Sequence, residues 1–353
     1  MKPEWAWMAA RMQSIDRKPG LEVPMVEDLW ADGKKVETSY PQMNLKGFKL
    51  VQVVDLFCGG GGFSEGSKLA GSEVVLAIDS WPEALTVHHA NHPDVKTMCL
   101  ELGGSIIETA AWIRTHLNPA AHFHLHGSPP CQAISNASNV NSDEGMRLVE
   151  WFIDLAEYME PDSWSMENVV PIGKKLDRLF PSIEYSKINC ANLGLPQTRQ
   201  RIIAGSGFTI KETHTQDQWV SVRDALPDLE GELEMTVNKN IKQRTLDEPF
   251  RTITSKVPSQ TRIVSRRRKK NEPPQSFSLL QPSHTITRLP AVIERHIPEP
   301  SEVIRSMSLE EAKILQGFPA DYLIPYEKKK DAWVIVGNAV PPVLGRAIME
   351  GLN

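Results

Sequence analysis

The 353-residue sequence lacks the features of several large protein classes. No window approaches the run of about 18 apolar residues that a membrane helix needs. The first residues, Met1–Trp5, contain no continuous apolar stretch of the secretory kind. The four cysteines (Cys58, Cys99, Cys131 and Cys190) include no Cys-x-x-Cys pair, so neither a disulfide framework nor a zinc ribbon is indicated. We therefore expect a cytoplasmic protein with free thiols, no metal and no membrane partner.

The composition is that of a globular protein, but its charge is unevenly distributed. Hydrophobic residues make up 41% and charged residues 24%, and the net charge is −5. Between Thr236 and His296, 13 Lys and Arg stand against 4 Asp and Glu, whereas the rest of the chain holds 26 basic and 40 acidic residues. A basic block inside an acidic protein suits contact with a polyanion such as a nucleic acid. A charged surface that only faces water is the alternative.

A glycine-rich turn follows the first predicted strand. The apolar run 49–57 predicts that strand, the glycines lie within Cys58–Gly66, and a helix follows. Glycines let the backbone approach a ligand closely and adopt positive φ. The next strand, 73–78, ends in Asp79, where an acidic residue about 20 positions beyond the turn can accept hydrogen bonds from ribose hydroxyls. The combination predicts a site for a nucleoside-bearing cofactor.

A second loop presents a thiol at the end of a strand. The run 121–126 predicts the strand, and the loop Gly127–Gln132 carries two prolines directly before Cys131. Each proline fixes φ near roughly −65° and lacks an N–H, so the loop cannot continue a ladder. It lies where ligands of open α/β sheets bind. Cys131 is therefore a candidate nucleophile, with a buried packing cysteine as the alternative.

Three histidines share one face of the strand before this loop. His122, His124 and His126 are two residues apart, the spacing that places side chains on the same side of a strand. A metal site is one interpretation, but no nearby carboxylate or thiolate has ligand spacing. We expect a polar strand face instead.

Strands and helices alternate through most of the chain. A capping box at Ser308 and Glu311 predicts a helix start. Further strands are predicted at 94–101, 184–189, 202–205 and 332–336, and helices at 105–117, 147–159 and the C-terminus. Alternation over about 160 residues predicts an α/β fold with a Rossmann-like, doubly wound sheet.

The stretch 207–300 has a different character. It is rich in Thr, Ser, Pro and basic residues, and Pro-x-x-Thr-Ile-Thr occurs in it twice, at 249–254 and 282–287. The basic run Arg266–Lys270 lies between the two copies. We interpret this stretch as a smaller inserted domain. The predicted parts are an N-terminal extension (1–48), a main domain (49–206), the insert (207–300) and a segment that returns to the main domain (301–353).

Six motifs, in order, resemble those of the DNA (cytosine-5)-methyltransferase family. They are Asp55–Phe63, Pro129–Gln132, Glu167–Val169, Gln197–Arg201, Arg305–Ser308 together with Leu315–Pro319, and Gly337–Val340. The match covers residues 50–206 and 301–353 and is interrupted where the family carries its target-recognition domain. The resemblance implies a class I S-adenosylmethionine-dependent methyltransferase fold with a smaller inserted target-recognition domain.

The resemblance also implies a covalent mechanism on a flipped-out cytosine. Cys131 would add to C6 of the base, which turns C5 into a carbon that can attack the methyl group of S-adenosylmethionine. Glu167 would supply a proton near N3, and Arg201 would hold O2. Arg199 would support the loop. After transfer the C5 proton would leave, and Cys131 would be released by elimination.

The resemblance assigns ten residues to cofactor binding. They are Phe57, Gly59, Gly61, Asp79, Ser80, Trp81, Glu101, Pro129, Asn338 and Ala339. Asp79 stands where glutamate is frequent, Glu101 where aspartate is frequent, and Ala339 where serine is usual. Either Ser80 or Trp81 is expected to lie against the adenine.

Double-stranded DNA is the expected partner of a monomeric enzyme in a bacterial or phage-infected cell, within restriction–modification. The expected DNA contacts are Gln132, Ser135, Arg251, Thr252, Arg266, Arg267, Arg268, Thr285, Thr287 and Arg288. Two alternatives stay open: a tRNA cytosine-C5 methyltransferase, and an inactive, cofactor-bound DNA-binding regulator. The basic insert favours DNA. The presence of Cys131, Glu167 and Arg201 argues against lost activity.

Overall fold

The computed structural model describes residues 51–130, 143–229, 232–237, 240–253, 261–264 and 303–352. The expected N-terminal extension, the loop that begins at Cys131 and the second Pro-x-x-Thr-Ile-Thr copy lie outside these ranges. The domain boundaries drawn from the sequence therefore stay predictions.

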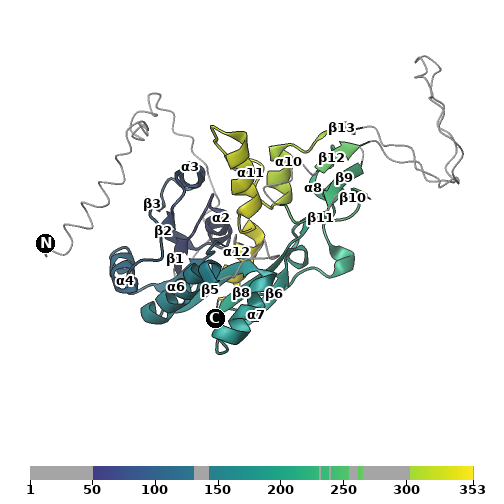
Figure 1. The fold of residues 1–353 in the computed structure, drawn as a ribbon. Coiled ribbons are helices and arrows are strands. Elements are labelled where there is room, and N and C mark those ends of the chain that lie inside the picture. The colour runs from purple at the N-terminus through teal and green to yellow at the C-terminus, as the bar shows by residue number, and fades with distance from the viewer. Residues whose placement is uncertain are drawn as a thin grey trace, which may run out of the picture. The chain divides into compact units, whose positions relative to one another are not determined.

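A seven-stranded sheet forms the centre of the described chain (Figure 1). Its strand order is β3-β2-β1-β4-β5-β8-β6. The strands are β1 Val51–Leu56, β2 Glu73–Asp79, β3 Lys96–Cys99, β4 His122–Gly127, β5 Ser163–Val169, β6 Tyr185–Asn189 and β8 Gln200–Ser206. The first five pair in parallel, and β8 runs antiparallel to both of its neighbours. The predicted doubly wound α/β sheet is confirmed.

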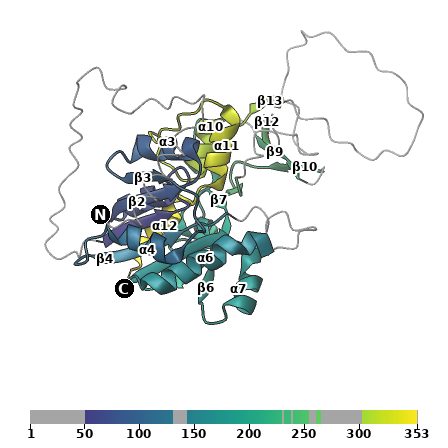
Figure 2. The same ribbon diagram turned by 60° about the vertical axis from the view of Figure 1, so that its left-hand side comes forward.

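Helices cover both faces of this sheet. Val53 and Val54 are neighbours on β1 whose side chains point to opposite faces, so they lie in different apolar cores. The core around Val54 contains residues of α4 (Ile106–Arg114) and α6 (Asp143–Met159), which pack against each other (Figure 2). The core around Val53 contains residues of α2 Gly62–Leu69 and α12 Pro342–Glu350. The two remaining helices of the main sheet are α3 Pro82–Asn91 and α7 Gly173–Leu179.

A third apolar core joins the middle of the chain to its C-terminal part. It includes Val222 of α8 (Val222–Ala225), Phe250 of β11 (Phe250–Arg251), Leu315 and Trp333. The strand expected at 332–336 is wrong, because these residues belong to helix α11, Lys329–Asn338. Ala332, Trp333 and Val336 form the buried side of that helix. A short apolar run has the same appearance in a buried strand and a buried helix.

Short strands and a capped helix complete the described chain. A four-stranded sheet has the order β10-β9-β12-β13, and β11 pairs with β7. Their bounds are β7 Gln197–Thr198, β9 Glu232–Val237, β10 Asn240–Arg244, β12 Thr261–Val264 and β13 Val303–Ser306. The predicted capping box is confirmed: Ser308 and Glu311 cap each other's backbone N–H at the start of α10, Leu309–Leu315.

Within the described residues, one helical stretch, 329–350, is long and apolar enough to cross a membrane. It is divided into α11 and α12, with Ala339 and Pro341 between them. Of its most apolar window, 72% is buried inside the protein, as in a core helix.

Candidate active site

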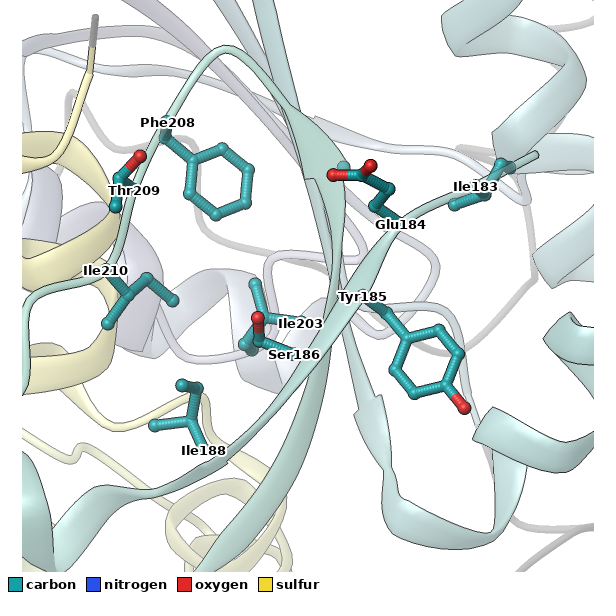
Figure 3. Close-up of a pocket in the computed structure, with 10 residues that line it drawn as sticks. Ile183, Glu184, Tyr185, Ser186, Ile188, Ile203, Phe208, Thr209 and Ile210 are labelled. Carbon is teal, nitrogen blue, oxygen red and sulfur yellow. The ribbon is translucent and has the colours of Figure 1, made fainter. Parts of the chain in front are cut away.

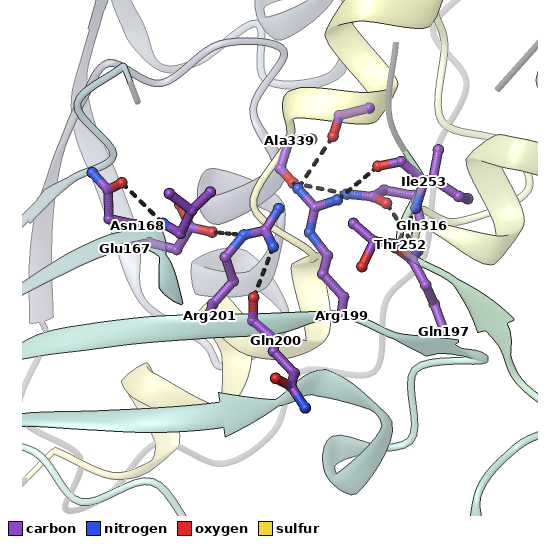
Figure 4. Close-up of polar contacts among 12 residues, drawn as sticks. Glu167, Asn168, Gln197, Arg199, Gln200, Arg201, Thr252, Ile253, Gln316 and Ala339 are labelled. Atoms are coloured by element: carbon purple, nitrogen blue, oxygen red, sulfur yellow. Dashed lines mark hydrogen bonds and ion pairs between the residues drawn. The ribbon is translucent and has the colours of Figure 1, made fainter. Parts of the chain in front are cut away.

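Two of the predicted catalytic residues form an ion pair. Glu167 stands on β5 and Arg201 on the antiparallel neighbour β8, where Val169 and Arg201 are register partners. Nε of Arg201 lies 2.6 Å from Oε1 of Glu167, and only 12% and 10% of the two side chains are exposed (Figure 4). Arg201 also donates from Nη1 to the carbonyl of Gln200 at 2.8 Å. The antiparallel pairing therefore brings the predicted acid and the base-holding arginine together.

The segment that leads to the predicted nucleophile is held beside this pair. Nδ2 of Asn168, the residue after Glu167, donates to the carbonyl of Pro129 at 3.2 Å. The side chain of Ser128 donates to the carbonyl of Phe57 at 2.9 Å. Pro129 was predicted as a cofactor residue, and it is buried here. The predicted residues Cys131, Gln132 and Ser135 lie outside the described ranges.

Arg199 is placed differently from Arg201. Its side chain is buried, with 1% exposed, and it lies beside that of Arg201 but contacts other partners (Figure 4). The guanidinium donates to the carbonyls of Ile253 at 3.0 Å, Gly337 at 3.2 Å and Ala339 at 3.0 Å. Arg199 thus joins the segment after β11 to the connection between α11 and α12.

Two buried glutamines extend this connection and were not predicted as site residues. Gln197 donates to the side chain of Gln316 at 3.0 Å and accepts from the N–H of Ile253 at 2.7 Å. Gln316 donates to the carbonyl of Ala339 at 2.8 Å. Both glutamines belong to the family-like motifs, and that membership was the one sequence signal that could have identified them.

The predicted glycine turn and the predicted acid are directly bonded. The N–H of Gly59 donates to Oδ2 of Asp79 at 2.8 Å, and the N–H of Trp81 donates to Oδ1 at 2.9 Å. Burial raises the pKa of Asp79, and these N–H groups oppose that rise. Gly59 has a φ of +53° and Gly61 of +88°, and a Cβ on Gly59 would meet no atom within 4 Å. The turn is therefore fixed while open space remains beside Gly59.

The other predicted cofactor residues differ in backbone conformation and exposure. Phe57 adopts a φ of +57°, which is uncommon for a non-glycine residue and is typical of functional sites. Trp81 packs against the apolar cluster that contains Ala339. Ser80, Glu101 and Asn338 are exposed.

A tyrosine from the C-terminal part holds the back of the glycine turn. Tyr322 donates from its hydroxyl to the carbonyl of Gly60 at 2.6 Å, and His92 Nε2 lies 3.3 Å from the same hydroxyl. A Cβ on Gly61 would lie 2.7 Å from this oxygen and 3.0 Å from Cδ2 of His88. No spacing pattern links positions so far apart in the sequence, so sequence reasoning missed this contact.

Asp55, the first residue of the glycine motif, is fully buried and had no predicted role of its own. Ser64 donates to its Oδ2 at 2.7 Å, and Nε2 of His88 lies 2.9 Å from the Ser64 hydroxyl. Burial raises the pKa of Asp55 to about 7 and lowers that of His88 to about 3. The buried network beneath the turn therefore contains titratable groups with shifted pKa values.

The described part of the expected insert contains two predicted DNA contacts. Arg251 pairs through its backbone with Thr198 in the β11–β7 ladder, and Thr252 donates from its hydroxyl to the Thr198 carbonyl at 3.1 Å. The remaining predicted contacts, Arg266, Arg267, Arg268, Thr285, Thr287 and Arg288, lie outside the described residues.

A pocket of about 550 Å³ lies between β6 and the segment after β8 (Figure 3). Ile203 and Phe208 line it on one side, and Tyr185 belongs to the strand that crosses it. Its lining includes no predicted catalytic or cofactor residue. In the described ranges, no three His, Cys, Asp or Glu side chains are grouped so that they could hold a metal ion.

Comparison with known proteins identifies relatives over most of the chain. The sequence profile of the family described as C-5 cytosine-specific DNA methylase matches residues 51–353. The Type II methyltransferase M1.HphI of Haemophilus parahaemolyticus is 27% identical over 338 residues, which cover 85% of this chain and 86% of that relative. The Type II methylase M.HgiDII of Herpetosiphon aurantiacus is 28% identical over 347 residues, which cover 85% of this chain and 94% of that relative.

Solved structures show the same fold at lower identity. The Entamoeba histolytica methyltransferase EhMeth aligns with a TM-score of 0.55 and 14% identity over 86% of this chain and 98% of that chain. A Spodoptera frugiperda DNMT2 variant aligns with a TM-score of 0.54 and 15% identity over 84% of this chain and 97% of that chain. At these identities the likeness shows the fold alone.

Proposed function

Because this chain belongs to the C-5 cytosine-specific DNA methylase family, we propose that it methylates C5 of a flipped-out cytosine in a specific duplex DNA sequence. Its family and relatives identify it as a DNA cytosine-5 methyltransferase. The observation that carries the finer proposal is the Glu167–Arg201 ion pair beside the segment that leads to Cys131.

The covalent step belongs to Cys131 in this proposal. Its thiolate adds to C6 of the cytosine, and C5 becomes an enamine-like carbon that can attack a methyl group. As charge builds towards N3, Glu167 supplies a proton there. The neighbouring Arg201 orients the base through O2. After methylation the C5 proton passes to solvent, and its electron pair restores the C5=C6 double bond and expels the Cys131 thiolate, while N3 returns its proton to Glu167.

We propose S-adenosylmethionine as the donor; when bound, it supplies an electrophilic methyl group. The residues present fit this donor. Space is open beside Gly59, and the carboxylate of Asp79 keeps acceptor capacity beyond the two N–H groups that it binds. Trp81, packed near Ala339, is better placed than the exposed Ser80 to lie against an adenine.

Duplex DNA as substrate, a monomeric state and a restriction–modification setting in a bacterial or phage-infected cell belong to the same proposal. The Type II names of the relatives and the basic block between Thr236 and His296 support duplex DNA. The tRNA alternative has no comparable support, and the inactive-regulator alternative is disfavoured by the paired Glu167 and Arg201.

The proposal is tested by incubating the full-length protein with labelled S-adenosylmethionine and either duplex DNA, the separated strands or tRNA. We expect label in duplex DNA, and bisulfite sequencing should then find 5-methylcytosine within one short sequence. Label in tRNA alone, or in none of the substrates, would overturn the proposal.

A further inference from the structure

Imidazole and hydroxyl groups alternate between β4 and β5 on one face of the main sheet. Nε2 of His122 lies 3.0 Å from Oγ of Ser163, and that oxygen lies 2.8 Å from Nδ1 of His124. Nε2 of His124 lies 2.9 Å from Oγ of Ser165, which lies 2.8 Å from Nδ1 of His126. All four distances are hydrogen-bond distances. We call these five side chains the His–Ser ladder.

The ladder is buried, and its hydrogen bonds depend on one another. All of its members except His122 are fully buried, and burial lowers the pKa of His124 to about 3. A neutral imidazole donates from one nitrogen and accepts at the other, and a serine hydroxyl donates once. Each donor therefore fixes the next, so the tautomers of the histidines depend on one another. The predicted polar strand face is present. The serines of the next strand bond its imidazoles, whereas Nε2 of His126 is buried with no hydrogen-bond partner among the described residues.

The ladder joins the two strands that carry the proposed chemistry. β4 ends at Gly127, directly before the segment that leads to Cys131, whereas Ser165 and Glu167 share one face of β5. His126 is the register partner of Ser165, and the last backbone pair, Gly127 with Met166, follows immediately. A one-residue slip would turn every side chain to the other face and break all four bonds.

The backbone pairing between these strands is short, so side-chain hydrogen bonds help to fix the register of β4 against β5. β4 and β5 are register partners at four positions, from His124 with Ser163 to Gly127 with Met166. Apolar side chains would bury this face without any polar group to satisfy, whereas a row of hydrogen-bonded polar side chains specifies one alignment. The histidines are not grouped as metal ligands in the described part of the chain.

We propose that the His–Ser ladder positions the end of β4, and with it the described segment Ser128–Pro130 that leads to Cys131, relative to Glu167, with Ser165 as its most important member. This inference rests on the proposed function and deepens it. These side chains act through the strand ends and do not touch the substrate, so they are positioning residues. Their loss should slow methyl transfer without weakening donor binding.

The test compares Ser165→Ala with Leu125→Ala, which removes a fully buried side chain from the other face of β4. We expect Ser165→Ala to lower kcat by about tenfold or more and to leave the Kd for S-adenosylmethionine within about twofold. Leu125→Ala should lower the melting temperature by at least as much as Ser165→Ala does, while the kcat of Leu125→Ala stays within about twofold of the wild type. Ser165→Thr keeps the hydroxyl and should restore most of kcat, because its partner on β8 is Gly205.

A kcat of Ser165→Ala within about twofold of the wild type would overturn the inference, and so would a matching loss in Leu125→Ala. If Ser165→Ala does not fold, Ser163→Ala breaks the ladder at its outer end and should lower kcat in the same direction by less; an unchanged kcat there also overturns it. Wild-type protein that methylates no DNA would instead contradict the proposed function. The two failures are therefore distinguishable.

Discussion

Arg201 and Glu167 form an ion pair of 2.6 Å between neighbouring antiparallel strands. The pair is almost fully enclosed by protein, so the geometry of each side chain is set by the other. In the proposed mechanism one member orients the cytosine and the other supplies a proton. Changing either should therefore affect the chemistry of the site.

We expect Glu167→Gln to lower kcat by about 10² to 10⁴, the range that loss of a general acid produces. The amide has the same shape but cannot transfer a proton to N3. Single-turnover methyl transfer on duplex DNA measures this step directly. Glu108→Gln, at an exposed position of α4, is the matched control and should keep the wild-type rate. A wild-type rate in Glu167→Gln would rule out the acid assignment.

Alanine substitutions at Gly59 and Gly61 should separate donor binding from stability. A Cβ on Gly59 enters open space, so Gly59→Ala should weaken S-adenosylmethionine binding by about tenfold and reduce stability by only about 1 kcal/mol. A Cβ on Gly61 would collide with the Tyr322 hydroxyl, so Gly61→Ala should reduce both the affinity for S-adenosylmethionine and the stability of the fold. Titration calorimetry and thermal melts measure the two quantities. Equal effects of the two substitutions on stability would contradict this account of the turn.

Stability should depend on pH through Asp55. Desolvation raises the pKa of this carboxyl from 3.8 to about 7, so the folded state holds the proton more tightly than the unfolded chain. Its contribution to stability is present below the unfolded pKa and is lost as pH rises to about 7. Asp55→Asn cannot ionise, so the melting temperature of the variant minus that of the wild type should rise between about pH 5 and pH 8.

Asp154→Asn, at an exposed position of α6, should show a constant difference over the same pH range. A constant difference for Asp55→Asn as well would mean that Asp55 is ionised in the folded protein throughout.

Arg199 should contribute more to stability than an arginine in an exposed ion pair. Arg199→Met removes three hydrogen bonds and leaves buried carbonyls without this donor, which should lower the free energy of unfolding by about 3 kcal/mol or more. Arg223→Met removes an exposed ion pair with Asp247 and should change the free energy of unfolding by less than about 1 kcal/mol. Urea unfolding measures both. Similar values for the two variants would show that the Arg199 contacts contribute little.

Local features of this fold were predictable from the sequence because they depend on neighbouring residues. The glycine turn, the acid at the end of β2 and the capping box at Ser308 each follow from a short pattern with its own physical cause. The strand expected at 332–336 was wrong, since five apolar residues do not distinguish a buried helix from a buried strand.

Contacts between distant segments were not predictable in the same way. The three histidines of β4 were visible as one polar face, but their partners Ser163 and Ser165 depend on the register between two strands. Tyr322 reaches Gly60 only because α10 is followed by a turn that returns to the glycine loop. Such pairings are set by the packing of the whole sheet and its helices.

The covalent role of Cys131 is tested most directly with duplex DNA that carries 5-fluorocytosine at the target. Fluorine at C5 leaves no proton to remove, so the enzyme cannot be released by elimination. Denaturing gel electrophoresis should show a protein–DNA complex with the wild type that requires S-adenosylmethionine, and none with Cys131→Ala. A complex of the same yield with Cys131→Ala, or no complex with active wild-type protein, would contradict the mechanism.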